Sequence, residues 1–259
     1  MRSALLALTL ALAAPAFAQD IEPRTNVAEL RKEAKADPAI KAALADTARP
    51  LESRLRDDTR MVDLILKEAG AKPGDRVLDV ASGGGYLALL FSKLVGPKGH
   101  VDIHNTPGWI VQFPSMDPDL QKQYMKQPNI GWITTSWNEL DAPADSYDLI
   151  MLGQVYHDII LESGDFVALN ERFFKMLKPG GRLVIEDHDA IETMTLNEQV
   201  YLHRISHGDV TGELLRAGFR ATDMILMESG HDDRRFNVFR PGIRGRTDRF
   251  IAVFEKPKT

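Results

Sequence analysis

Two spacings of hydrophobic residues alternate along this chain, and their order predicts an α/β fold. Short apolar runs between turn residues are typical of strands, as in VLDV at residues 77–80 and GHVDIHN at 99–105. Apolar residues three and four positions apart are typical of helices, as in YLALLFSKLVG at 86–96. Since strands and helices alternate, most strands should be parallel, with helices on both faces of the sheet.

Five further segments complete a predicted sheet of seven strands. They are IGWITTSW (130–137), SYDLIMLGQVY (146–156), RLVIEDHD (182–189), FRATDMILMES (219–229) and DRFIAVFEK (248–256). The last two have no helix between them, so they should form an antiparallel hairpin at the edge of the sheet. The predicted fold is a Rossmann-like, doubly wound, seven-stranded sheet that is mostly parallel and ends in this hairpin.

The start of the chain has the pattern of an export signal. Arg2 is followed by a run of Leu and Ala, and Ala16-Phe17-Ala18 is a small-x-small cleavage motif. The apolar run is too short to span a bilayer comfortably. We therefore expect cleavage after Ala18, no stable membrane insertion afterwards, and a periplasmic or secreted protein.

A helical arm is predicted between the signal and the main domain. Residues 26–45 are rich in Ala, Lys and Glu and indicate one or two helices broken at Pro38, and residues 51–69 indicate another helix that stops at Gly70. The expected organisation is a signal peptide at 1–18, an N-terminal helical arm at 19–50 and the α/β domain at 51–259.

The composition narrows the class of partner. The formal net charge is -5, which argues against general nucleic-acid binding, because that usually requires a basic face. With 44% hydrophobic residues and no cysteine, the chain can bury a full core without disulfides. A small-molecule ligand is the expected partner.

A glycine-rich loop follows the first strand, where ligands of doubly wound sheets bind. Gly83, Gly85 and Ala88 satisfy the dinucleotide pattern G-x-G-x-x-A, and Asp102 lies about 20 residues further on. This pattern alone leaves a nicotinamide oxidoreductase open. Asp79 inside the strand and the terminal hairpin argue against that alternative.

The stretch DVASGGG at 79–85 resembles the first motif of class I S-adenosylmethionine (SAM) methyltransferases, acidic-x-Gly-x-Gly-x-Gly. SYDLI, MLKPGGRLVI and the terminal hairpin extend the resemblance over nearly all of the chain after the signal. It implies that Asp79 contacts the methionine amino group through the loop, that Asn105 takes the place of the usual ribose-binding acid, and that Ser136 or Trp137 contacts adenine. The loop residues that would line the cofactor are Ala81, Gly83, Gly84 and Gly85.

Several runs resemble a narrower family of exported methyltransferases whose substrate is unassigned. These runs are HNTPGW, VYHD, EDHD, LHRI, RRFNVF and RGRTDRF. The resemblance refines the expected fold and leaves the reaction open.

Polar residues cluster at the predicted strand ends beside the loop. Tyr156, His157 and Asp158 follow the fourth strand, and Asp187 and His188 end the fifth. A methyl acceptor must lose a proton, and a histidine near neutrality is suited to take it. We expect His157 or His188 to be this base, with Asp158 or Asp187 as its orienting partner.

His203 and Arg204, from the segment before the next helix, join the same cluster. Its histidines and acids could also hold a divalent ion. However, Gly153 occupies the fourth-strand position where magnesium-dependent catechol methyltransferases have an acid. The sequence therefore predicts no metal, and a metal-assisted enzyme is kept as an alternative.

The segment between the last two strands is dense in arginine and predicts a clamp for a carboxylate or phosphate. A solvated loop with charges balanced by neighbouring acids is equally consistent. The candidate substrate-binding residues are Arg204, Arg235, Asn237, Arg244 and Arg246.

Together these features predict an exported, SAM-dependent methyltransferase. It would act on an oxygen or nitrogen atom of a small, anionic substrate. The other alternative is a binding protein that keeps the fold without transferring methyl groups, which export favours because SAM is made in the cytoplasm.

Overall fold

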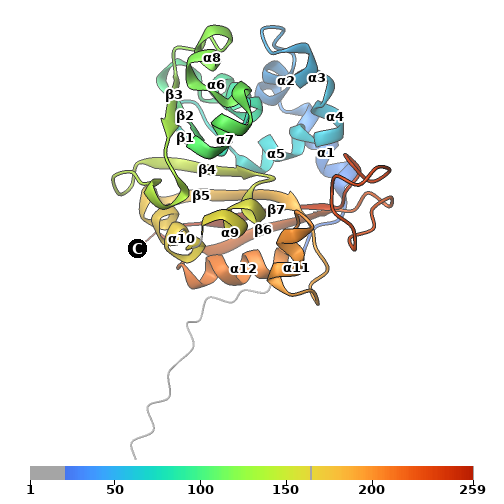
Figure 1. Cartoon of the computed structure of the whole chain (residues 1–259). Coiled ribbons are helices and arrows are strands. Elements are labelled where there is room, and N and C mark those ends of the chain that lie inside the picture. The colour runs from blue at the N-terminus through green and yellow to red at the C-terminus, as the bar shows by residue number, and fades with distance from the viewer. Residues whose placement is uncertain (1–20, 164, 259) are drawn as a thin grey trace, which may run out of the picture.

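The computed structural model describes residues 21–163 and 165–258. The expected signal peptide at residues 1–18 lies outside this part. One central sheet carries helices on both faces, and a long loop near the C-terminus extends from one end of it (Figure 1). This is the predicted Rossmann-like architecture.

The sheet has seven strands in the order β3-β2-β1-β4-β5-β7-β6. Their bounds are β1 Arg76–Val80, β2 His100–Asn105, β3 Ile130–Thr134, β4 Tyr147–Gly153, β5 Leu177–His188, β6 Arg220–Met227 and β7 Arg249–Glu255. Strands β1 to β5 pair in parallel, whereas β7 lies antiparallel between β5 and β6. The predicted terminal hairpin is therefore confirmed, with β6 at the edge.

The helices vary in length from a single turn to three turns. They are α1 Val27–Ala36, α2 Pro38–Leu44, α3 Leu51–Leu55, α4 Asp57–Arg60, α5 Val62–Ala69, α6 Tyr86–Val95, α7 Pro107–Gln112, α8 Pro118–Tyr124, α9 Tyr156–Ser163, α10 Phe166–Met176, α11 Leu196–Tyr201 and α12 His207–Arg216. Three short 3-10 helices are η1 Gly96–Lys98, η2 Pro114–Met116 and η3 Trp137–Glu139. Among the described residues, no helix is both long and apolar enough to cross a bilayer.

Two core clusters cover the two faces of the sheet. Val77 and Leu78 are neighbours in β1 and belong to different clusters, because alternate side chains of a strand face opposite sides. One cluster packs α1, α2, α5 and α6 on the sheet, and the other packs α9, α10 and α12. Since α1 and α2 share the first cluster, the N-terminal arm packs as part of the same unit.

The prediction of one continuous helix at residues 51–69 is wrong, because the structure divides this segment into the three helices α3, α4 and α5. Helices α3 and α4 contain no buried residue, so no packing holds a continuous helix there. The break is at Met61, which adopts a left-handed φ of 51°. This break has a functional consequence, since it places Arg60 beside the ends of β4 and β5.

Two strand boundaries also differ from the prediction. Strand β4 ends at Gly153 rather than Tyr156, because Gln154 adopts a positive φ of 59° and α9 begins at Tyr156. Strand β5 begins at Leu177, before the Pro-Gly-Gly that was expected to precede it. The helices α7 and α8 were not predicted, although capped Thr-Pro and Asp-Pro pairs open them, a common helix start.

Candidate active site

The glycine loop lies where the order of strands reverses, since β1 pairs with β2 on one side and β4 on the other. Ala81, Gly83 and Gly85 have positive φ angles of 50°, 61° and 78°. Gly85 also needs its small size, because an added Cβ would lie 1.9 Å from the Met125 side chain. By contrast, a Cβ on the exposed Gly84 would meet nothing within 4 Å, so the loop is open at this residue.

Asp79 is a buried carboxyl group directly beneath this loop. It accepts a hydrogen bond from Ser82 Oγ at 2.5 Å. Burial raises the pKa of Asp79 to about 7, although the contacts from Ser82 and Ala88 and the charge of Arg60 act in the opposite direction. Asp79 forms no ion pair with a basic side chain in the described part of the chain, so its ionised form is poorly stabilised. An ammonium group bound at the loop would supply the missing positive charge.

The three residues predicted to contact adenosine, Asn105, Ser136 and Trp137, form hydrogen bonds with other residues of the chain. Asn105 binds the loop itself: its Oδ1 accepts from Gly83 N at 2.9 Å and its Nδ2 donates to Gly83 O at 3.0 Å. Ser136 Oγ donates to Glu139 at 2.8 Å. Trp137 packs edge-on against Trp109 and donates its indole N–H to a glutamate of α9. All three side chains therefore hold local structure together.

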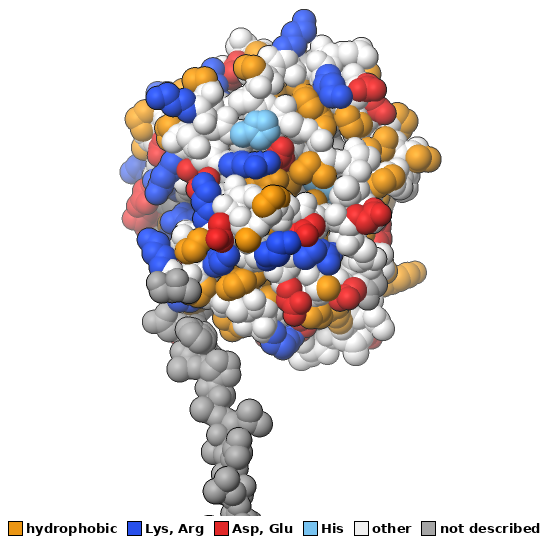
Figure 2. Space-filling model, turned by 90° about the vertical axis from the view of Figure 1, so that its left-hand side faces the viewer, with side chains coloured by type: hydrophobic (Ala, Val, Ile, Leu, Met, Phe, Trp, Pro, Cys, Tyr) orange, Lys and Arg blue, Asp and Glu red, His pale blue; other side chains and the backbone are white. Residues whose placement is uncertain are grey.

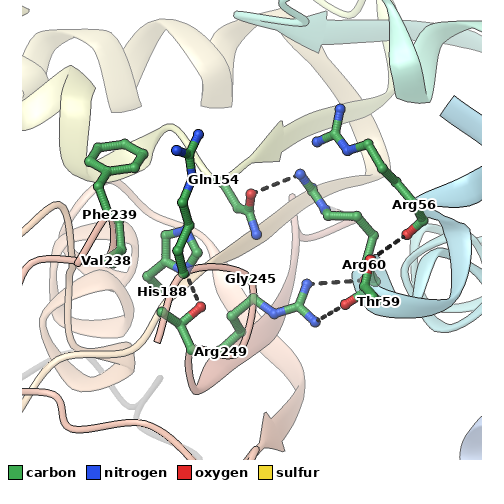
Figure 3. Close-up of a pocket in the computed structure, with 11 residues that line it drawn as sticks. Arg56, Thr59, Arg60, Gln154, His188, Val238, Phe239, Gly245 and Arg249 are labelled. Atoms are coloured by element: carbon green, nitrogen blue, oxygen red, sulfur yellow. Dashed lines mark hydrogen bonds between the residues drawn. The ribbon is translucent and has the colours of Figure 1, made fainter. Parts of the chain in front are cut away.

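A cavity of about 440 Å³ lies between α3–α4, the ends of β4 and β5, and the C-terminal loop (Figure 3). Its lining residues Arg56 and Arg60 lie over the ring of Tyr86, the residue that follows the glycine loop, at 5.2 and 5.7 Å from the ring centroid. All residues that line the cavity are Arg56, Thr59, Arg60, Gln154, His188, Val238, Phe239, Arg244, Gly245, Thr247 and Arg249. We call it the arginine cavity. In Figure 3 the Arg60 side chain extends towards Gln154, whose Oε1 accepts its hydrogen bond at 2.7 Å.

One buried glutamate partly balances the positive charge of this cavity. Glu186 is fully buried and binds Arg60 Nη2 at 2.9 Å and Arg249 Nη1 at 2.8 Å. Arg56 and Arg244 are exposed at the rim, and neither has an acidic partner among the described residues. Four guanidinium groups thus face one carboxylate.

Two further observations indicate that the cavity is short of negative charge. Desolvation by the surrounding chain, to which the charge of Arg60 adds, lowers the pKa of Arg56 although the residue reaches solvent at the rim. The Nε atom of Arg60 is buried, and no hydrogen-bond partner for it lies in the described part of the chain. An anion in the cavity would meet both needs.

His188 lines the cavity at the end of β5. Its Nδ1 lies 2.8 Å from Thr247 Oγ1, and its Nε2 has no partner within the described ranges. Burial, followed by the charges of His157 and Arg249, lowers the pKa of His188 well below its usual value. The ring is therefore neutral at pH 7, and burial together with the surrounding positive charges disfavours its protonated form, so it can act as a base only where a bound anion offsets these charges.

His157 lies behind His188 in a separate network. Its Nδ1 lies 2.7 Å from Oδ1 of the buried Asp187, which confirms the contact between a histidine and an acid expected here. Burial lowers the pKa of His157, but the charge and hydrogen bond of Asp187 together with the charge of Asp158 outweigh this effect and raise the pKa above its usual value. Asp158 contacts both His157 and His203, at 3.4 and 3.2 Å.

Other residues predicted from the sequence lie away from the cavity. Tyr156 is fully buried in the second core cluster, where its hydroxyl accepts from Asn170. Arg204 is also fully buried and pairs with Asp232 at 2.8 Å. Arg235 pairs with its neighbour Asp233 on the surface.

Of the five candidate substrate-binding residues, only Arg244 lines the arginine cavity. Asn237 donates to the backbone oxygen of Tyr201, and Arg246 is exposed outside the lining. The sequence interpretation did not single out Arg56 or Arg60 for this site, and it included Arg249 only as one arginine of the dense segment before the last strand. The available signal was Glu186, a charged residue inside an apolar strand, because a buried acid requires cationic partners.

Arg60 connects the cavity with the glycine loop. Its Nη2 would lie 3.8 Å from a Cβ added to Gly153, at the end of β4, and its charge acts on Asp79. Backbone strain also gathers here. The described non-glycine residues with positive φ are Met61, Ala81, Asp145, Gln154 and His203, and all but Asp145 belong to or adjoin the loop, the cavity or the histidine network.

Comparison with known proteins agrees with this geometry. The profile of the ubiE/COQ5 methyltransferase family matches residues 56–217. The ubiquinone/menaquinone biosynthesis C-methyltransferase UbiE of Vibrio vulnificus is 32% identical over 120 residues, 45% of this chain and 42% of that protein. The 2-phytyl-1,4-naphtoquinone methyltransferase of Synechococcus elongatus is 32% identical over 143 residues, 54% of this chain and 58% of that protein.

The match therefore spans about half of the length of these relatives. Among solved structures, a SAM-dependent methyltransferase from Aquifex aeolicus superposes with a TM-score of 0.58 at 19% identity, over 90% of this chain and all of that one. This likeness confirms the predicted methyltransferase fold.

Proposed function

Since this chain belongs to the ubiE/COQ5 methyltransferase family, we propose that it transfers a methyl group from SAM to a small anionic acceptor bound in the arginine cavity. The observation that carries the proposal is the positive charge of this cavity, which Glu186 balances only in part and which reaches Tyr86 at the end of the glycine loop. We propose an oxygen or a nitrogen as the acceptor atom, with His188 placed to take its proton. A carbon atom, the target named for the UbiE relative, would also release a proton, and analysis of the product separates the two.

The glycine loop fits the amino-acid end of the cofactor. Asp79 lacks a full positive partner, and Gly84 leaves the loop open. We expect Asp79, Gly83, Gly84 and Gly85 to hold this end. Because Asn105, Ser136 and Trp137 are engaged within the fold, the adenosine end would be held less firmly than in proteins with a ribose-binding acid.

The positions of the residues around the cavity indicate the role of each in methyl transfer. SAM, when bound, supplies an electrophilic methyl group. Arg56, Arg60 and Arg244 bind the anionic group of the acceptor and fix its orientation. His188 would accept the acceptor's proton at Nε2 in the tautomer whose Nδ1–H donates to Thr247 Oγ1, and the contact between Nδ1 and Oγ1 fixes the position of the ring.

Export remains part of the proposal and rests on residues 1–18 alone. If the signal acts as expected, amino-terminal sequencing of the protein recovered outside the cytoplasm will begin at Gln19. An amino terminus at Met1 in that fraction would contradict cleavage.

The distribution of charge supports a small-molecule acceptor rather than a nucleic acid. On the face shown in Figure 2, basic and acidic side chains lie among one another and among hydrophobic ones. A nucleic-acid surface usually concentrates basic residues on one face.

The acceptor class can be tested with hydroxybenzoates and aminobenzoates, each offered as the carboxylate and as its methyl ester, with methyl-labelled SAM. We expect at least about a tenfold higher kcat/KM for the carboxylates, because each charge-assisted hydrogen bond contributes about 1.5–3 kcal/mol. The double variant Arg56→Gln/Arg244→Gln should lose this preference. Arg235→Gln, at an exposed arginine outside the cavity, should keep it.

Three outcomes of this experiment would contradict the proposal. Equal kcat/KM for carboxylates and esters would show that the cavity does not select an anionic acceptor. A methyl group on a ring carbon, located by NMR of the product, would show that the acceptor atom is neither an oxygen nor a nitrogen. Binding of SAM with transfer to none of the acceptors would favour a binding protein without transfer activity.

A further inference from the structure

A second constellation of side chains lies next to the arginine cavity and takes no part in the proposed transfer. His157 and Asp158 open helix α9, and His203 lies in the turn after α11. One ligand atom from each of these three residues lies within 4.8 Å of the other two. His157 is buried, whereas Asp158 and His203 are half-buried, so an ion could enter from solvent.

The distances within this group suit coordination of an ion. Asp158 Oδ2 lies 3.4 Å from His157 Nε2, and Asp158 Oδ1 lies 3.2 Å from His203 Nδ1. Two ligand atoms at 2.0–2.1 Å from a tetrahedral zinc ion stand about 3.4 Å apart. By comparison, the direct hydrogen bond between His157 and Asp187 measures 2.7 Å. The two contacts of Asp158 are longer than this charge-assisted hydrogen bond and close to the ligand separation, and because they start from different oxygens, both oxygens of Asp158 would face the ion.

Asp187 supplies the support that metal-binding histidines usually have. It binds His157 Nδ1, which fixes the ring and leaves Nε2 directed towards Asp158. A carboxylate on the second nitrogen of a ligating histidine orients the ring and increases its basicity. The His203 ring is also fixed, by edge contacts with His157 at 5.5 Å and with Phe239 at 5.0 Å between ring centroids.

We propose that His157, Asp158 and His203 bind one divalent transition-metal ion of the zinc class. Two imidazoles and one carboxylate favour zinc or iron(II) over magnesium and calcium, which prefer oxygen ligands alone. Three protein ligands leave open coordination positions. The site adjoins the arginine cavity, because Phe239 both lines the cavity and contacts His203.

Calorimetric titration of the untagged full chain, first stripped with a chelator, tests this site without any methyl donor. Zinc is expected to bind at one ion per chain, at least about 100-fold more tightly than magnesium. His203→Gln and Asp158→Asn should each weaken zinc binding at least about 100-fold, since even outer-shell substitutions cost 10- to 100-fold. Circular dichroism of each variant establishes that it is folded.

His207→Gln is the matched control. His207 also contacts two carboxylates, those of Asp189 and Glu192, but lies outside the proposed site. This variant should bind zinc as the unaltered chain does, and zinc should raise the Tm of both. The proposal is wrong if 1 mM zinc does not bind, if His203→Gln and Asp158→Asn keep full affinity, or if the loss follows His207→Gln instead.

Discussion

Replacing His188 by glutamine is expected to lower kcat for methyl transfer by about 100- to 10,000-fold, the usual contribution of a general base. Glutamine fills similar space and can keep a hydrogen bond to Thr247, but it cannot accept the acceptor's proton. The affinity for SAM should stay within about twofold, because His188 lies on the cavity side and not on the glycine loop.

The measurement uses the acceptor found among the carboxylates described above and compares kcat with the calorimetric Kd for SAM. His100→Gln is the control, since His100 lies at the start of β2 and pairs with Asp102, away from the cavity. A kcat within threefold of the unaltered chain in a folded His188→Gln variant would show that another group takes the proton.

Replacing Glu186 by glutamine is expected to lower the free energy of unfolding by about 3–5 kcal/mol, the cost of removing one partner from a buried ion pair. Glu186 is fully buried and binds both Arg60 and Arg249. Glutamine keeps the shape of the side chain but leaves both guanidinium groups without a negative partner. Urea unfolding at pH 7 measures the effect.

Glu255→Gln is a matched control for this prediction, because the Glu255–Arg220 pair lies closer to solvent, and exposed pairs contribute about 0–1 kcal/mol. Inorganic phosphate should recover part of the stability lost in Glu186→Gln, since an anion in the cavity would replace the missing charge. A loss below about 1 kcal/mol would mean that the cavity tolerates its positive charge without Glu186.

The sheet could be predicted from the sequence because its signals are local. Apolar runs bounded by turn residues gave all seven strands, and the missing helix between the last two gave the antiparallel pairing of β6 and β7. The helices around residues 51–61 could not be placed in this way. Their break depends on the left-handed backbone of Met61 and on distant partners of Arg60, which no local pattern records.

The site was predicted in part. The neighbourhood of His157, Asp158, Asp187 and His188 follows from strand ends that meet at one edge of a sheet, and His203 joins them from the turn after α11. The arginine cavity does not follow, since Arg60 and Glu186 are 126 residues apart in sequence. Arg204 shows the opposite failure, because a sequence cannot tell a buried arginine paired with Asp232 from one that faces a ligand.

The proposed function depends most on the binding of SAM by Asp79 and the glycine loop. Calorimetric titration of SAM at pH 6 and pH 8, with the unaltered chain, Asp79→Asn and the distant control Asp223→Asn, tests it most directly. The pKa of Asp79 is raised to about 7, so the group is mostly protonated at pH 6 and mostly ionised at pH 8. Only the ionised form attracts the ammonium group of the cofactor.

We expect about tenfold weaker binding at pH 6 than at pH 8 for the unaltered chain and for Asp223→Asn, as linkage to one group of pKa near 7 requires. Asp79→Asn should bind more weakly than the unaltered chain at pH 8 and should lose the pH dependence. Equal affinity of Asp79→Asn and the unaltered chain at pH 8, or no binding at millimolar SAM, would show that Asp79 and the loop do not hold the cofactor.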